Sequence, residues 1–283
     1  MKRQYFKSGI IFLITILICS GCNQRPKVKE NQVVNSKGQT GTVEVEVFDA
    51  VKLKDQLVDI IKTAPNSGEL VDFINKVGYS YMAELTLSTD NAEKYITVAE
   101  QSLAAGIYKF DLLYAKAYNR FDVASQIFEV QEKLVAKIGL QGDIAAMKKY
   151  NDRISHNKEN TDSLNVIMSA MMNELAQSYL SGEHSGVYAL SYISANLEGL
   201  YILTQIASMS KDNTEIIKVI GQQKERVKTN YQLLEIMAAD PAIIPVFEKM
   251  KPILNSFSGP EFTAKQLAEV APLIAGLRNE IAK

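Results

Sequence analysis

Ser185 to Met209 reads SGVYALSYISANLEGLYILTQIASM and contains one charged residue, Glu198. A helix over these residues is apolar nearly all round, as is typical of a helix in a protein interior. Its serine, asparagine, threonine and glutamine residues make it too polar for a lipid bilayer. Small residues such as Ser194 and Gly199 would let neighbouring helices approach closely. We therefore predict that this helix is the central and most buried element of the protein.

Helical periodicity continues on both sides, from Asp49 to the end of the sequence. No proline occurs between Pro65 and Pro241, as a chain of long helices requires. The predicted helices cover residues 50–63, 68–77, 90–105, 107–119, 122–138, 143–156, 162–181, 185–209, 214–238, 241–256 and 263–282. Because most connections are short, sequential helices should pack as antiparallel neighbours. The sequence thus predicts an all-α fold, an antiparallel α–α hairpin array that is either a short TPR-like solenoid or a closed helical bundle.

Length and proline placement give the predicted domain organisation. The 283 residues allow one large domain, which we place at residues 43–283. Most of the prolines fall at or after Pro241, so we predict that residues 241–283 form a proline-punctuated capping segment.

The first residues follow the pattern of a bacterial secretion signal. Basic residues precede the apolar run GIIFLITILI over residues 9–18, which is shorter than the roughly 20 residues of a membrane span. Ser20-Gly21-Cys22 follows and resembles the lipobox of bacterial lipoproteins, in which the cysteine is acylated and becomes the mature N-terminus. This resemblance implies a signal peptide over residues 1–21 and acylation of Cys22, for example with palmitate.

Two of the predicted helices carry longer motifs. Gly106 to Asn119 reads GIYKFDLLYAKAYN, and Asn196 to Ala207 reads NLEGLYILTQIA. Both are similar to helices in a group of uncharacterised all-helical lipoproteins of Bacteroidota. The resemblance covers most of the predicted domain and implies an all-helical lipoprotein. It implies no activity, because none is assigned to the group.

Other interpretations of the N-terminus remain open. Cys19 and Cys22 could be a redox or metal-binding C-x-x-C pair, or the apolar run could be an uncleaved anchor. If Cys22 is lipidated, the polar residues 22–42, which include no aromatic side chain, would form a flexible tether. Surface-export signals of Bacteroidota lipoproteins carry acidic residues behind the cysteine, whereas the residues here are basic and amide-rich. By that resemblance we expect an outer-membrane anchor and a domain that faces the periplasm.

Composition narrows the classes of function. The chain has 31 Lys and Arg against 32 Asp and Glu, a net charge of −1, which argues against a nucleic-acid partner. Motifs such as H-E-x-x-H, G-x-S-x-G and the Walker loop do not occur. His156 and His184 each lack a second ligand at helical spacing, so we predict no metal site and no cofactor. The expected partners are the membrane, through the N-terminal lipid, and a protein, a peptide or a small polar ligand.

Two acids stand out because each lies on an apolar, aromatic helix face. Asp111 and Glu198 both begin the pattern acid-x-Leu-Tyr. Tyr108 lies one turn before Asp111, while Lys109 and Lys116 are predicted to mark the solvent side of that helix. A carboxylate on such a face must find hydrogen bonds, a cation or a proton. We therefore predict that both acids are buried.

Two interpretations of the acids remain open. In the first, tyrosine hydroxyls, Asn196 or Arg120 satisfy both acids, which are then structural ties. In the second, a cleft between the two helices receives a polar ligand and is lined by Tyr108, Asp111, Tyr114, Asn196, Glu198 and Tyr201. The predicted function is a non-catalytic, envelope-anchored binding or interaction module. The alternative is an enzyme in which Asp111 and Glu198 act without a recognisable motif.

Overall fold

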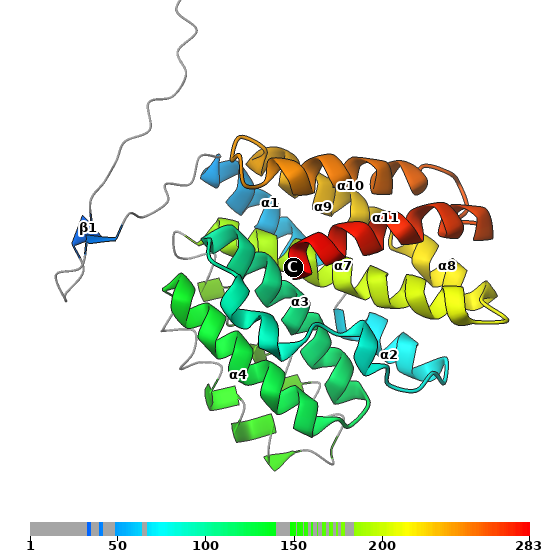
Figure 1. Ribbon diagram of the computed structural model, residues 1–283, viewed down its shortest axis with the longest axis horizontal. Coiled ribbons are helices and arrows are strands. Elements are labelled where there is room, and N and C mark those ends of the chain that lie inside the picture. The colour runs from blue at the N-terminus through cyan, green and yellow to red at the C-terminus, as the bar shows by residue number, and fades with distance from the viewer. Residues whose placement is uncertain are drawn as a thin grey trace, which may run out of the picture. The chain divides into compact units, whose positions relative to one another are not determined.

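The computed structural model describes residues 33–34, 40–41, 49–63, 67–139 and 184–283, with individual residues between 148 and 178 (Figure 1). The predicted signal peptide 1–21, Cys22 and most of the tether 22–42 lie outside the described residues, as does much of the predicted helices 143–156 and 162–181. Contacts divide the chain into two units, Met1–Val45 and Glu46–Lys283. In the first unit, strands β1 (Val33–Val34) and β2 (Thr40–Gly41) pair antiparallel.

The described part of the second unit is helical, which confirms the predicted all-α class. Its α-helices are α1 (Ala50–Thr63), α2 (Ser67–Lys76), α3 (Val98–Ala117), α4 (Phe121–Ile138), α7 (Ser185–Met209), α8 (Thr214–Gln222), α9 (Lys224–Met237), α10 (Ile244–Ser256) and α11 (Ala264–Ala282). Two 3₁₀ helices, η1 (Ala83–Leu85) and η2 (Thr89–Lys94), lie between α2 and α3. Buried apolar side chains from all of these elements form one contiguous core.

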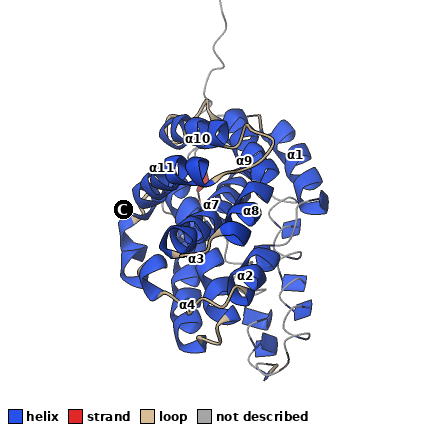
Figure 2. Ribbon diagram, turned by 90° about the vertical axis from the view of Figure 1, so that its right-hand side faces the viewer, coloured by secondary structure: helices blue, strands red, loops and turns tan. Residues whose placement is uncertain are grey.

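α7 is the central helix of this core. It packs against α1, α2, α3, α8, α9 and α11, and Figure 2 shows α7 among these helices. Most of its residues are buried, including its single charged residue, Glu198. The predicted central, buried helix over residues 185–209 is therefore confirmed, with the same bounds. Among the helices that the structure describes, none is long and apolar enough to cross a membrane.

The predicted helix break at Gly106 is wrong, because α3 continues through this residue to Ala117. A Cβ atom on Gly106 would overlap the hydroxyl of Ser194 and the carbonyl of Ser191, both on α7. The glycine therefore marks the point where α3 and α7 cross closely, and it does not end the helix. A glycine required for close helix packing and a glycine that ends a helix look the same in the sequence.

α3 begins at Val98, and not at residue 90 as predicted. The capping box is formed by Thr97 and Glu100: the Glu100 N–H donates to Thr97 Oγ1 at 3.2 Å, and the Thr97 N–H donates to Glu100 Oε2 at 3.1 Å. Asp90 and Glu93, whose spacing suggested the helix start, belong to the 3₁₀ helix η2.

α7 approaches its neighbours closely at a second glycine. A Cβ atom on Gly199 would lie 2.7 Å from the ring of Phe110 on α3 and 2.8 Å from a methyl group of Leu70 on α2. These distances are shorter than a van der Waals contact, so a larger residue here would require the side chains of Phe110 and Leu70 to shift. The predicted close approach of helices at Gly199 is confirmed.

The predicted single helix 214–238 is also wrong, because the structure contains two helices there, α8 and α9. The backbone N–H of Gln223 bonds three residues back to the Ile220 carbonyl at 3.0 Å, which interrupts the helical ladder. Its side-chain Nε2 donates to the Val219 carbonyl, also at 3.0 Å. The hydrophobic periodicity of the sequence continues across this break, so the periodicity alone could not predict two separate helices.

Candidate functional site

α3 and α7 bring Asp111 and Glu198 together inside the protein. Both side chains are fully buried, with 0% of their surface exposed. Their carboxyl groups lie close enough to interact directly. The predicted burial of both acids is therefore confirmed.

Arg278 of α11 is the cationic partner of Glu198. Its Nε and Nη2 atoms donate to the two carboxylate oxygens of Glu198, each at 2.9 Å. Nη2 also donates to the Leu85 carbonyl at 3.3 Å, and the guanidinium carbon lies 4.8 Å from the centre of the Tyr201 ring. Two parallel hydrogen bonds to one carboxylate are the strongest geometry that an arginine offers.

The partners predicted for the acids are different from those in the structure. Arg120 forms an exposed ion pair with Asp122 at 3.1 Å. Asn196 Nδ2 donates to Asn230 Oδ1 of α9 at 3.0 Å, so this amide bonds to another element. Sequence reasoning missed Arg278 because it lies 80 positions after Glu198. The available signal was a lone arginine on an otherwise apolar face of α11.

Among the described residues, one backbone N–H group donates a hydrogen bond to Asp111. Its Oδ2 atom accepts from the Leu87 N–H at 2.8 Å. Its Oδ1 atom has no donor among the described residues, and the carboxylate of Glu198 lies within interaction distance of the Asp111 carboxyl group. Two ionised carboxylates cannot bond to each other, but a protonated Asp111 can donate from Oδ1 to Glu198. The geometry therefore fits a neutral Asp111 beside an ionised Glu198.

Burial and the neighbouring negative charge both raise the pKa of Asp111. Burial raises the pKa of Asp111 well above its ordinary value, and the negative charge of Glu198 raises it further. Burial also raises the pKa of Glu198, but Arg278 acts against this effect through its hydrogen bonds and charge. With one proton on Asp111, the three side chains carry no net charge, which is the condition for placing them in a core.

Side chains of α3 also hold the irregular segment between α2 and α3. We call residues 81–95 the strap. The Met82 N–H donates to the Tyr114 hydroxyl at 3.2 Å, and the Tyr108 hydroxyl donates to the Ser88 carbonyl at 2.7 Å. Together with the Leu87 N–H on Asp111, these bonds satisfy backbone groups that lack a helical or sheet partner.

The end of the strap is fixed to α11. The Tyr95 hydroxyl donates to the Ala282 carbonyl at 3.0 Å, and Asn91 Nδ2 donates to the same carbonyl at 3.3 Å. Burial raises the pKa of Tyr95 and of Tyr114 to about 12, and it also raises the pKa of Tyr108. These hydroxyls therefore remain protonated donors at neutral pH.

The six residues proposed to line a ligand cleft belong to separate sets of contacts in the structure. Asp111 and Glu198 lie beside each other, Tyr201 lies against Arg278, and Tyr108 and Tyr114 bond to the strap at Ser88 and Met82. Asn196 bonds instead to α9. Ligand binding by these residues stays a prediction.

The predicted solvent-facing lysines of α3 are only partly exposed. Lys109 and Lys116 are both half-buried, and Lys109 Nζ lies 5.9 Å from the centre of the Tyr188 ring. Burial lowers the pKa of each ammonium group to about 8. This side of α3 is therefore less open to water than its two lysines suggested.

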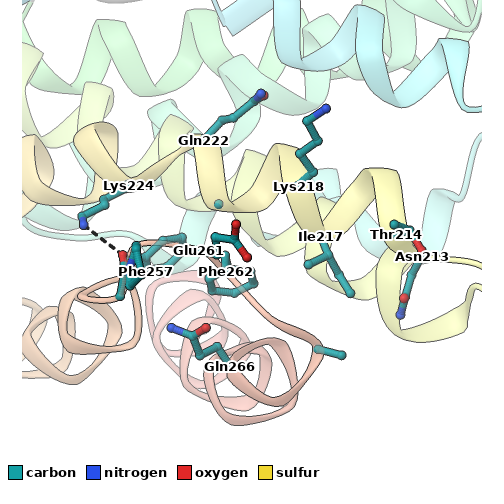
Figure 3. Close-up of a pocket in the computed structure, with 14 residues that line it drawn as sticks. Asn213, Thr214, Ile217, Lys218, Gln222, Lys224, Phe257, Glu261, Phe262 and Gln266 are labelled. Carbon is teal, nitrogen blue, oxygen red and sulfur yellow. Dashed lines mark hydrogen bonds between the residues drawn. The ribbon is translucent and has the colours of Figure 1, made fainter.

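A surface groove of about 700 Å³ lies between α8 and residues 257–266 (Figure 3). Ile217 of α8 and Phe262 before α11 extend into the space between these elements, and Glu261 lies beside them. Lys218 and Gln222 extend from α8 in another direction. Sequence reasoning missed this groove, because its two walls lie about forty residues apart and neither carries a recognisable motif.

Hydrogen bonds and ring stacking fix the wall formed by residues 257–266. The rings of Phe257 and Phe262 stack with their centres 4.9 Å apart. Lys224 Nζ donates to the Gly259 carbonyl at 3.2 Å, and Gln266 Nε2 donates to the Ser256 carbonyl at 2.8 Å. The groove is therefore largely preformed, as ligand sites usually are.

Neither a search for metal-binding groups nor comparison with known proteins assigns a function to these residues. Within the described part of the chain, no group of three His, Cys, Asp or Glu side chains could hold a metal ion. Comparison with protein-family models, curated proteins and solved structures gives no match.

Proposed function

We propose that the protein is a lipid-anchored, non-catalytic interaction module that binds an extended segment of a partner protein in the groove between α8 and residues 257–266. The groove itself carries this proposal. Its volume of about 700 Å³ lies within the range of about 300–1,000 Å³ that is typical of ligand sites. An apolar centre with polar edges is the usual composition of a protein interface.

The lining residues define the chemistry of the bound segment. Ile217 and Phe262 would receive an apolar side chain. Glu261 is exposed and has no ion-pair partner among the described residues, so it would pair with a lysine or arginine of the segment. We therefore propose a segment in which an apolar anchor residue lies next to a basic residue.

The anchoring part of the proposal rests on the N-terminal sequence. We propose that residues 1–21 are a signal peptide, that Cys22 is acylated, and that residues 22–42 tether the domain to the periplasmic side of the outer membrane. The basic residues, the apolar run and Ser20-Gly21-Cys22 support this assignment. Lipid anchoring would keep the groove near envelope proteins without a membrane-spanning helix.

We further propose that the helices form a closed bundle of antiparallel hairpins, and not an open solenoid. In a solenoid each repeat contacts only its neighbours in sequence. α7 instead packs against α1, α2 and α3 as well as α8, α9 and α11. These contacts support closure around α7.

The enzyme alternative would use Asp111 and Glu198 as acid and base. Arg278 binds both oxygens of Glu198, and the Leu87 N–H binds Asp111. Each acid is therefore held by groups of the protein, which supports a structural role for the pair.

Peptide display tests the proposed function. The full chain, purified in detergent, is used to select binders from a library of displayed random peptides, and a selected peptide is then synthesised. We expect selected peptides to share an apolar residue next to Lys or Arg. Glu261→Lys should weaken binding about tenfold or more, because it replaces attraction by repulsion.

Two variants complete the experiment. Glu248→Lys makes the same charge change at an exposed acid of α10 outside the groove and should leave binding within about twofold. Asp111→Asn should also leave it unchanged. Loss of binding in Asp111→Asn but not in Glu261→Lys would move the site to the buried acids, and a failure to select any such peptide would contradict the proposal.

A further inference from the structure

The strap covers a pair of acids that shares a single cation. Arg278 reaches the pair from α11, and the charges acting on Asp111 are those of Glu198 and Arg278. The other titratable groups that face the pair are tyrosines: Tyr108 of α3, Tyr201 of α7, and Tyr81 and Tyr95 of the strap. Their pKa values are all raised, so they remain neutral around pH 7.

The charge of this cluster depends on one proton. With Asp111 protonated, the charges of Glu198 and Arg278 cancel. With Asp111 ionised, the same buried volume holds one uncompensated negative charge, which a protein interior strongly disfavours. Loss of the proton therefore favours any arrangement that lets water reach Asp111.

The strap is the element whose movement would admit that water. It contains two short 3₁₀ helices, and its backbone is held by side chains of the cluster and its surroundings. The Leu87 N–H binds Asp111, and the Leu85 carbonyl accepts from Arg278. In contrast, α3, α7 and α11 are long helices with their own hydrogen-bond ladders.

We propose that Asp111 and Glu198 form a proton-controlled latch: the proton on Asp111 holds the strap closed over α3 and α11, and its release opens the strap. This device is independent of the groove. It gives the segment between α2 and α3 two states whose balance depends on pH.

The direction of the pH dependence follows from linkage. In the open state, Asp111 meets water and should have an ordinary pKa of about 3.9. In the closed state its pKa is raised by burial and by Glu198. The stabilisation of the closed state is therefore fully present below about pH 3.9 and is lost as pH rises through the closed-state pKa. Over that interval the opening constant should rise about tenfold per pH unit, and it should level off above it.

Other groups titrate in the same range and require a control. Lys109 and Lys116 lie on α3 with pKa values lowered to about 8. Asp111→Asn leaves both lysines in place, so comparing this variant with the unmodified chain at each pH isolates Asp111. The asparagine also keeps the hydrogen bonds of a neutral Asp111: its oxygen accepts from Leu87 and its amide donates to Glu198.

Hydrogen exchange measured by mass spectrometry tests the latch. The full chain in detergent is exchanged from about pH 5 to about pH 9, and rates are corrected for the intrinsic pH dependence of amide exchange. We expect protection of strap peptides to fall about tenfold per pH unit and then level off, while α7 stays protected. In Asp111→Asn, this tenfold change per pH unit should be absent from the strap peptides.

Glu84→Gln is the matched control, because it converts an exposed acid of the strap into an amide. It should keep the pH profile of the unmodified chain. An identical profile in Asp111→Asn, or pH-independent protection in the unmodified chain, would overturn the proposal. A failure of Asp111→Asn to fold at neutral pH would overturn it as well, because asparagine reproduces the bonding of the neutral acid.

Discussion

Arg278 of α11 binds Glu198 of α7 through two hydrogen bonds of 2.9 Å inside the hydrophobic core. The guanidinium is 9% exposed at its side chain and the carboxylate is not exposed at all, so little water competes with the pair. Through the additional bond to the Leu85 carbonyl, the same arginine connects α7, α11 and the strap. One residue near the C-terminal end of the sequence thus fixes the segment before α3.

Removing the charge of Glu198 should destabilise the protein strongly. In Glu198→Gln, the buried Arg278 would lose the carboxylate that accepts from both Nε and Nη2, and we expect a loss of about 3–5 kcal/mol in the free energy of unfolding. Chemical unfolding of the full chain measures this loss. The double variant Glu198→Gln with Arg278→Met removes both charges and should recover much of the stability, and no recovery would contradict the charge explanation.

The close crossing of α3 and α7 predicts opposite effects of one substitution at two helical glycines. Gly106→Ala should destabilise by about 1–3 kcal/mol, because the new methyl group overlaps Ser194 and the Ser191 carbonyl. Gly276→Ala in α11 meets no atom within 4 Å and should stabilise by up to about 1 kcal/mol. Thermal unfolding of both variants measures the difference, and equal shifts would show that α3 and α7 do not approach so closely.

Burial of α7 predicts large losses from truncation of its apolar side chains. Ile202 is 0% exposed, and Ile202→Ala should cost about 2–5 kcal/mol in the free energy of unfolding. Val51 of α1 is 72% exposed, so Val51→Ala should change stability by less than about 0.5 kcal/mol. Urea unfolding distinguishes them, and a loss near zero for Ile202→Ala would show that α7 is peripheral.

The N-terminal sequence predicts that Cys22 carries the lipid. Cys22→Ala should leave an unprocessed precursor, because the acylated residue is missing. Metabolic labelling with a clickable fatty acid, followed by electrophoresis, measures both lipid and processing. Cys19→Ala is the control and should still be labelled. Undiminished labelling of Cys22→Ala would rule out this anchor.

The sequence was sufficient for features that depend on local pattern. The helix Ser185–Met209 was predicted with its observed bounds, because a long run with one charge has few other structures available. The burial of Asp111 was predicted from its neighbours one turn away on the same helix. Both inferences need only residues that are close in sequence.

Features that depend on distant residues could not be predicted in this way. Arg278 lies 80 positions from Glu198, and the groove joins α8 to residues around Phe262. Gly106 resembles a helix stop until Ser194 is placed beside it. The strap is irregular, and side chains of other elements, such as Tyr108, form hydrogen bonds with its backbone. A local hydrophobic pattern does not reveal such bonds.

We infer that Asp111 is protonated at neutral pH. Both the structural role of the two acids and the proposed latch depend on this proton. Infrared spectroscopy of the full chain, labelled with ¹³C at aspartate carboxyl groups, measures the protonation state of Asp111 directly. At about pH 7 we expect a carbonyl band of a protonated carboxylic acid that shifts with the label and is absent from Asp111→Asn. A spectrum that shows only ionised aspartate carboxylates, or an acid band that persists in Asp111→Asn, would contradict a proton shared between Asp111 and Glu198.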